Sequence, residues 1–273
     1  MNVAAAMRGP GKTPMGIILG IAFGLLLLLG NNELITWIGL AALGMAGWEL
    51  ASLQKRRRRQ RLGYVAALLV AALLSRWILA GNRGAVDEFF FLAALLWAFL
   101  GPLFLIQAGR PRPGMVAALG ALALVSAWLS LAVLVEYDRW LLIGGVAGVC
   151  LGDWAASAAG RRLGSRPLAP AISPNKTWEG ALAALLVLYL YATALWWLFL
   201  RDGGLQHWLF LLLGAAVAAL GVLGDLVVSR LKRLAGVKDS GVLLGSHGGL
   251  LDRVDSWLPV LPFLALVSTL LAS

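Results

Sequence analysis

The sequence predicts an all-α, polytopic integral membrane protein with about nine transmembrane helices. Three observations favour this fold class. Of the 273 residues, 60% are hydrophobic and 13% are charged, and the mean hydropathy is +0.85, which ordinary soluble domains do not reach. The apolar residues form runs of roughly 16 to 23 residues, the length that crosses about 30 Å of hydrocarbon. The basic residues behind the net charge of +10 lie in short segments between these runs.

The apolar runs divide the chain in order. A polar N-terminal tail, residues 1–14, precedes the first run, which lacks a following small-residue cleavage site and is therefore interpreted as an uncleaved span. Residues 15–136 form an N-terminal transmembrane region, and residues 137–273 form a C-terminal region that holds most polar motifs. The predicted spans, each placed to within about 2–4 residues, are 15–30, 34–53, 62–81, 89–109, 115–136, 140–160, 178–200, 207–229 and 251–272.

The distribution of charge predicts an orientation. With a cytoplasmic N-terminus, all but four of the 23 Lys and Arg residues fall on the cytoplasmic side, as the positive-inside rule requires. The basic tract at 55–59 is interpreted as a stop-transfer signal and anionic-lipid anchor. Glu49, near this tract, and Arg76, which can extend its charge outwards, are interpreted as structural residues. The four exceptions are Arg76, Arg83, Arg139 and Arg201.

Two classes of interaction are not expected. A nucleic-acid partner is not expected, because the basic residues are divided among short loops and do not form one continuous patch. Cys150 is the single cysteine and lies in an apolar run, so no intrachain disulfide is expected.

One polar stretch, residues 229–256, lies between two strongly apolar segments. If the preceding helix continues into it, Asp225, Ser229 and Lys232 share one helical face. Gly248 and Gly249 can then bring backbone N–H groups close to an anion at the start of the next helix. This arrangement predicts a binding site for a phosphate-bearing ligand.

Several carboxylates accompany these cations. Carboxylates beside phosphate-binding cations repel an anionic ligand unless a hard divalent ion lies between them, so Mg²⁺ is expected, with a second metal ion left open. Asp153 and Asp225 are predicted just below the cytoplasmic face, and acids within spans usually face a polar interior. The sequence therefore predicts a shared, cytoplasm-facing polar pocket.

The polar stretch resembles the signature of the phosphatidate cytidylyltransferase (CDP-diacylglycerol synthase) family. Residues 173–180, SPNKTWEG, resemble a second motif of the family. Asp153-Trp154, together with the GRRLG run at 160–164, resembles a third motif more loosely. The resemblance covers residues 150–256. The signature positions that match are Ser229, Lys232, Arg233, Lys238, Asp239, His247, Gly248, Gly249, Asp252, Arg253 and Asp255.

The resemblance implies an activity and a set of roles. The activity is the Mg²⁺-dependent transfer of CMP from CTP to phosphatidic acid, giving CDP-diacylglycerol and pyrophosphate for phospholipid biosynthesis. The implied location is a bacterial-type inner membrane with the active site facing the cytoplasm, and residues 137–273 become the catalytic region.

The implied catalytic residues are Lys232, Arg233, Lys238, His247 and Arg253. The implied substrate-binding residues are Ser173, Asn175, Lys176, Thr177, Ser229, Gly248 and Gly249. The implied metal ligands are Asp225, Asp252, Asp239, Asp255 and Asp153.

Alternatives stay open at this point. A related CTP-dependent enzyme could act on another lipid phosphate, and a transporter of phospholipid or nucleotide would also place charges within the membrane. A transporter would more naturally show matching interrupted helices in its two halves, whereas the polar residues here are concentrated in the second half. Lys176 could flank a helix that Asn175 or Thr177 caps, and Asp153 could be a polar packing contact. A homodimer is compatible with either function.

Overall fold

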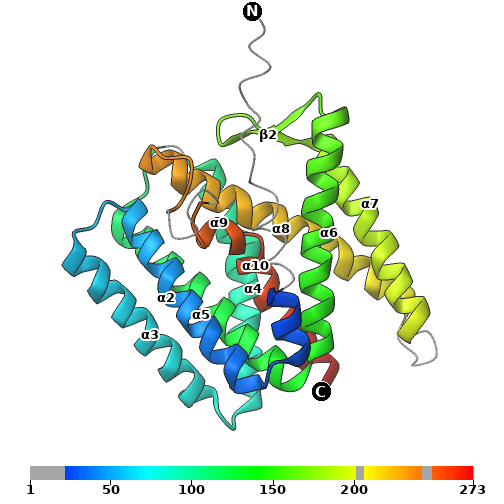
Figure 1. Cartoon of the computed structure of the whole chain (residues 1–273), viewed down its shortest axis with the longest axis horizontal. Helices are drawn as coiled ribbons and strands as arrows, with labels where there is room; N and C mark the ends of the chain where they lie inside the picture. Colours follow the sequence, from blue (N-terminus) through cyan, green and yellow to red (C-terminus); the bar gives the residue numbers. More distant parts are fainter. Residues whose placement is uncertain (1–21, 108, 201–205, 242–247, 273) are drawn as a thin grey trace, which may run out of the picture.

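The protein is a bundle of long helices (Figure 1). The computed structural model describes residues 22–107, 109–200, 206–241 and 248–272. The long helices, in chain order, are α2 (Asn32–Leu53), α3 (Arg58–Leu79), α4 (Arg83–Ile106), α5 (Pro113–Tyr137), α6 (Arg139–Leu163), α7 (Trp178–Leu195) and α8 (His207–Ala235).

Shorter elements connect and follow these helices. A two-stranded antiparallel sheet of β1 (Pro167–Ala169) and β2 (Ser173–Thr177) lies between α6 and α7. A π-helix, η2 (Trp196–Leu200), continues α7. The one-turn helix α9 (Leu251–Val254) precedes α10 (Trp257–Ala272).

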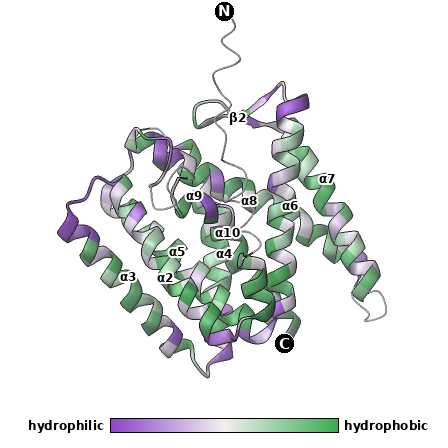
Figure 2. Ribbon diagram, viewed as in Figure 1, coloured by the Kyte–Doolittle hydropathy of each residue, from purple (hydrophilic) through white to green (hydrophobic). Residues whose placement is uncertain are grey.

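The prediction of an all-α, polytopic membrane protein is confirmed. Within the described residues, seven helices are long and apolar enough to cross a membrane, and Trp257–Leu271 is a shorter apolar helix. Figure 2 shows apolar residues along most of these helices and hydrophilic residues at many of their ends. The first predicted span, 15–30, lies only partly within the described residues, of which 22–29 are helical. The count of nine helices therefore stays a prediction.

Some predicted boundaries differ from the observed ones. Helices α3 and α4 begin several residues earlier than predicted, at Arg58 and Arg83, because polar residues extend each helix beyond its apolar run. The predicted last span, 251–272, is broken between α9 and α10. The β1–β2 hairpin was not predicted, because strands this short carry no clear periodic pattern.

Side chains and one glycine determine where the helices begin and end. Four N-cap residues each accept a hydrogen bond from a backbone N–H three residues later, as helix starts require. At the other end of α8, Gly236 adopts the left-handed conformation with φ of 79°, which glycine adopts without steric cost. This turn directs the chain from α8 into the polar stretch. The four caps are Asn31, Asn82, Asp138 and Thr177.

Helix α5 lies in the core of the bundle. It is the most buried of the candidate spans and packs against α2 and α10. Trp128 on α5 donates its indole N–H to the carbonyl of Thr36 on α2 at 3.0 Å. Helices α6 and α7 run side by side along one side of the bundle, and α8 crosses behind α6 (Figure 1). The polar stretch thus emerges from a rigid apolar scaffold.

A glycine brings α8 against the junction of α9 and α10. A Cβ atom at Gly224 would overlap the carbonyl oxygen of Asp255 and would lie 2.8 Å from Pro259 Cδ. Only a residue without a side chain permits this approach. The approach places Asp225 next to the start of α10.

Candidate active site

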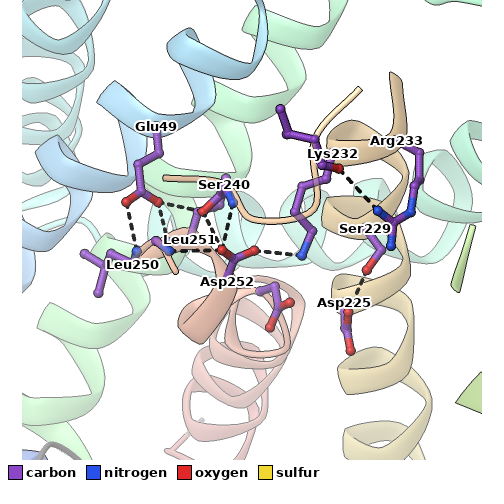
Figure 3. Close-up of polar contacts among 12 residues, drawn as sticks. Glu49, Asp225, Ser229, Lys232, Arg233, Ser240, Leu250, Leu251 and Asp252 are labelled. Atoms are coloured by element: carbon purple, nitrogen blue, oxygen red, sulfur yellow. Dashed lines mark hydrogen bonds and ion pairs between the residues drawn. The ribbon is translucent and has the colours of Figure 1, made fainter. Parts of the chain in front are cut away.

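The first polar cluster joins α8 to β2. The Ser229 hydroxyl donates to Asp225 Oδ1 at 3.0 Å, one helical turn away. Lys176 Nζ, from β2, lies 2.5 Å from Asp225 Oδ2. Figure 3 shows Asp225, Ser229 and Lys232 along α8, as predicted. Lys176, from the motif at 173–180, contacts Asp225 from β2.

Two more acids lie beside this cluster. Asp153 on α6 interacts electrostatically with Lys176 and Asp225, and Asp255 interacts with the same two groups. The Asp255 side chain is only 8% exposed and accepts a hydrogen bond from the backbone N–H of Ser256 at 2.8 Å. Three carboxyl groups therefore surround one lysine. Negative charges this close repel one another, and a further bound cation would reduce that repulsion.

Asp252 organises the second polar cluster. Its Oδ1 lies 2.7 Å from Lys232 Nζ, and its Oδ2 accepts the backbone N–H groups of Ser240 at 2.8 Å and Gly249 at 3.0 Å. Burial by itself raises the pKa of Asp252, but the hydrogen bonds from Lys232, Ser240 and Gly249 outweigh this effect and lower the pKa below its usual value. Asp252 is therefore negatively charged at neutral pH.

Glu49 on α2, interpreted from the sequence as a structural residue, holds the loop of the site, a contact that the sequence did not indicate. It is 1% exposed, and its two oxygens accept the backbone N–H groups of Leu250 at 2.9 Å and Leu251 at 2.8 Å. The Ser240 hydroxyl lies 2.8 Å from Glu49 Oε2 and 3.0 Å from Asp252 Oδ2, so it can donate to either carboxylate. Figure 3 shows Glu49 beside the start of α9. One signal could have indicated this role: an acid inside an apolar span is costly unless it has partners.

The glycine pair allows this close packing. Gly248 has a φ of 81°, in the region that favours glycine. A Cβ atom at Gly249 would overlap Ser240 Oγ and Glu49 Oε2. The N–H of Gly249 donates to the carboxylate of Asp252, so in this structure it holds the loop together, although the sequence suggested that it faces an anionic ligand.

The motif at 173–180 forms β2 and the first turn of α7. Thr177 is the N-cap of α7, and its hydroxyl oxygen accepts the N–H of Gly180 at 3.2 Å. Glu179 accepts the Ser165 hydroxyl at 2.6 Å and the Arg166 N–H at 3.3 Å, which ties α7 to the chain before β1. The capping alternative is thus observed for Thr177, while Lys176 reaches Asp225.

The other predicted site residues lie around these clusters. Arg233 donates to the carbonyls of Ile172 and Val237, each at 3.2 Å, and so links the hairpin to the end of α8. Ser173 is half-buried on β2. His247 lies outside the described residues. The exposed members of the predicted set are Asn175, Arg233, Lys238, Asp239 and Arg253.

The clusters fit a metal ion that arrives with its ligand. Within the described ranges, no three His, Cys, Asp or Glu side chains converge into a ready-made metal cage. Mg²⁺ in nucleotide sites usually takes only one or two carboxylates and receives its other ligands from phosphates and water. Asp225 Oδ2 and Asp252 Oδ1 each already hold a cation, the ammonium group of Lys176 or Lys232. Each of these two carboxylate oxygens is a hard donor of the kind that Mg²⁺ prefers.

The fold and the site define a polytopic membrane protein with paired lysines and carboxylates at one end of its helices, suited to a phosphate-bearing ligand. Comparison with known proteins gives the family. The model of the cytidylyltransferase family matches residues 12–271. The chain therefore belongs to the cytidylyltransferase family.

Curated relatives carry one common name, phosphatidate cytidylyltransferase. The relative from Pseudomonas aeruginosa is 34% identical over 262 residues, which cover 91% of this chain and 92% of that protein. The relative from Mycobacterium bovis is 32% identical over 279 residues, covering 93% and 88%. The relative from Staphylococcus haemolyticus is 47% identical over 116 residues, a match that covers 42% of this chain and only 44% of that protein.

Proposed function

We propose that this protein transfers CMP from CTP to phosphatidic acid, giving CDP-diacylglycerol and pyrophosphate. Family membership and the common name of the relatives support this activity. The observation that carries it is the pair of lysine–carboxylate contacts, Lys176 with Asp225 and Lys232 with Asp252, on one side of α8. Two ammonium groups paired with two carboxylates suit a ligand with several phosphates and a metal ion.

The reaction needs positioned charges more than a protein nucleophile. A phosphate oxygen of phosphatidic acid attacks the α-phosphorus of CTP, the new P–O bond forms, and the bond to the bridging oxygen of the β-phosphate breaks, so pyrophosphate leaves. Lys176 and Lys232 can each move from a carboxylate to a phosphate oxygen and neutralise its charge. Ser229, held by Asp225, can orient a phosphate oxygen from the same helical face.

Asp225 and Asp252 are our proposed principal Mg²⁺ ligands, because each has one oxygen that faces a replaceable ammonium group. Asp153, Asp239 and Asp255 are further candidates. When bound, the ion would neutralise phosphate charge and polarise the phosphoryl group. The residues of the chain would then supply orientation and the remaining positive charge.

The direct test is an assay of the purified protein in detergent with CTP, MgCl₂ and phosphatidic acid. We expect CDP-diacylglycerol and pyrophosphate in equal amounts by mass spectrometry and a coupled phosphate assay. Excess EDTA should abolish product formation, and added MgCl₂ should restore it. Absence of product with phosphatidic acid, but product with a different lipid phosphate, would move the activity to a related cytidylyltransferase. Undiminished turnover in EDTA would contradict the metal proposal.

Gly249→Ala should lower turnover by about 10-fold, because the new methyl group would overlap Ser240 Oγ and Glu49 Oε2 and displace the loop. Gly63→Ala is the matched control, because a Cβ atom there has no neighbour within 4 Å. The measurement is the initial rate at saturating CTP. Equal rates for Gly249→Ala and the wild type would show that the tight packing of this loop is not needed for activity.

We also propose that the site faces the cytoplasm of a bacterial-type inner membrane, where CTP is found, on the basis of the positive-inside rule. Arg166 precedes β1 and Arg83 begins α4, and both are exposed. In a Cys150→Ala background, Arg83→Cys should react with a membrane-impermeant maleimide from the periplasmic side. Arg166→Cys should react only after the inner membrane is opened. The opposite labelling pattern would reverse the orientation.

A further inference from the structure

Two cavities lie on the side of α8 that faces away from the candidate active site. Leu231 lines both cavities. With 3.6 residues per turn, Leu231 projects from a different side of α8, roughly 120° from Asp225 and roughly 160° from Ser229. The space between α8 and helices α2, α4 and α5 is therefore separate from the site that holds the predicted catalytic residues.

The two cavities adjoin each other. The first, which we call the inner cavity, has a volume of about 70 Å³ and a wholly apolar lining that includes Phe104 and Leu251. The second, the outer cavity, has a volume of about 180 Å³ and reaches the connections between α2 and α3 and between α4 and α5. Leu50, Val116 and Leu231 line both cavities and form the neck between them. An apolar cavity of about 150 Å³ can hold a group the size of benzene; the outer cavity exceeds this volume and the inner cavity is smaller.

The outer cavity is basic at its mouth. Lys55 and Arg110 line it, and both are exposed on the side where α2 and α4 end. Neither cavity has a carboxylate among the described residues that line it. Lys55 has a φ of 55°, the left-handed conformation in which helices commonly end, and it begins the connection from α2 to α3.

A buried cation lies next to the inner cavity. Arg230 is 8% exposed, and its guanidinium group lies 4.8 Å from the ring centre of Phe104, which lines the inner cavity. Its Nη2 donates to the carbonyls of Gln107 and Gly109, whereas its Nη1 has no hydrogen-bond partner within the described part of the chain. An unpaired buried donor is costly, and a nearby anionic or ester oxygen would reduce that cost.

We propose that the outer and inner cavities together bind one anionic phospholipid, at a site distinct from the substrate site. The phosphate lies at Lys55 and Arg110, where positive charge attracts it. One acyl chain enters the outer cavity and passes the neck at Leu50, Val116 and Leu231 towards the inner cavity, where it is removed from water and from competing lipid. This site goes beyond the proposed catalytic function and does not depend on it.

The position of the lipid site couples it to the loop of the polar stretch. Leu50 adjoins Glu49 in α2, and Leu251 lines the inner cavity while donating its N–H to Glu49. A bound chain therefore packs against the residues that hold Asp252 and the start of α9. Occupancy should slow the local opening of this segment.

Lipid binding can be measured without CTP. The purified full chain is placed in nanodiscs with equal amounts of phosphatidylglycerol and phosphatidylcholine, and retained lipid is counted by native mass spectrometry. We expect the wild type to retain one phosphatidylglycerol in preference to phosphatidylcholine. The double variant Lys55→Gln/Arg110→Gln should lose this preference by at least about 10-fold, since each cation at a membrane surface contributes roughly fivefold. Arg112→Gln, an exposed neighbour that lines neither cavity, should behave as the wild type.

The acyl-chain part of the proposal has its own variant. Val116→Phe fills the neck and should abolish retention of both lipids, whereas Leu122→Phe, at a position on α5 that is 39% exposed, should not.

Hydrogen exchange of Leu250 and Leu251 should be slower with phosphatidylglycerol than with phosphatidylcholine in the wild type and equal in Val116→Phe. Equal retention of the two lipids by the wild type, or unchanged retention in the charge and neck variants, would overturn the site. These readouts use no nucleotide, so their failure is separate from failure of the proposed activity.

Discussion

Asp252→Asn should lower CDP-diacylglycerol formation by at least about 100-fold, the scale of losing several kcal/mol of transition-state electrostatics. Asp252 Oδ1 faces Lys232 Nζ at 2.7 Å, and Oδ2 faces the backbone N–H groups of Ser240 and Gly249 at 2.8 and 3.0 Å. Every neighbour of the carboxylate in this network is a donor. An asparagine must turn its NH₂ group towards one of these sets, so a donor meets a donor in either orientation.

The same substitution removes the charge that a hard cation needs. Asp252→Asn therefore combines the loss of a charge with the loss of hydrogen bonds, and titration with MgCl₂ separates these two effects. If Asp252 contacts the ion, the variant should need at least about 10-fold more MgCl₂ for half-maximal rate, because one charged ligand is lost. If it only positions the loop, the rate should fall without a change in the MgCl₂ requirement.

Arg57→Gln is the control that shows whether removing a charge elsewhere in the protein lowers the rate. Arg57 is exposed at the start of α3, away from both clusters, and the variant should keep its rate within about 3-fold, as most surface substitutions do. Near-normal turnover of Asp252→Asn at low MgCl₂ would show that neither the ligand role nor the positioning role is needed. Asp225, with Asp255 beside it, would then be the better pair of metal ligands.

Short-range patterns in the sequence predicted much of this molecule. Apolar runs of membrane-spanning length marked the long helices, because each run must bury its backbone polar groups within one helix. The helical repeat placed Asp225 and Ser229 one turn apart on one face, and their side chains are indeed hydrogen bonded. Such predictions succeed because they depend on residues that are close together along the chain.

Contacts between distant residues were not predictable in the same way. Leu250 donates to Glu49 across 201 positions of sequence, and no local pattern around either residue indicates this pairing. Lys176 was predicted to bind phosphate, but its contact with Asp225 depends on how the hairpin folds over α8. The hairpin itself consists of strands of three and five residues, too short for an alternating pattern to identify.

Glu49→Gln should lower turnover by roughly 30-fold and the melting temperature by roughly 3–10 °C, because buried donors that lose an acceptor cost about 1–3 kcal/mol each. The Glu49 oxygens accept the N–H groups of Leu250 and Leu251 and lie next to the Ser240 hydroxyl. In glutamine, one of the two oxygens becomes an NH₂ group that faces a backbone N–H. The size of the side chain is unchanged, so the effect reports hydrogen bonding and charge and not a cavity.

Glu33→Gln is the matched control, because Glu33 lies in the first turn of the same helix and is exposed. The rate and melting temperature of this variant should stay at wild-type values.

Hydrogen exchange distinguishes a local from a global effect of Glu49→Gln. If Glu49 holds the start of α9, the amides of Leu250 and Leu251 should exchange faster, while that of Trp128 in the core should change little. Uniformly faster exchange would make Glu49 a general stability residue. Wild-type turnover in Glu49→Gln would mean that catalysis does not require this link between α2 and the loop that carries Asp252.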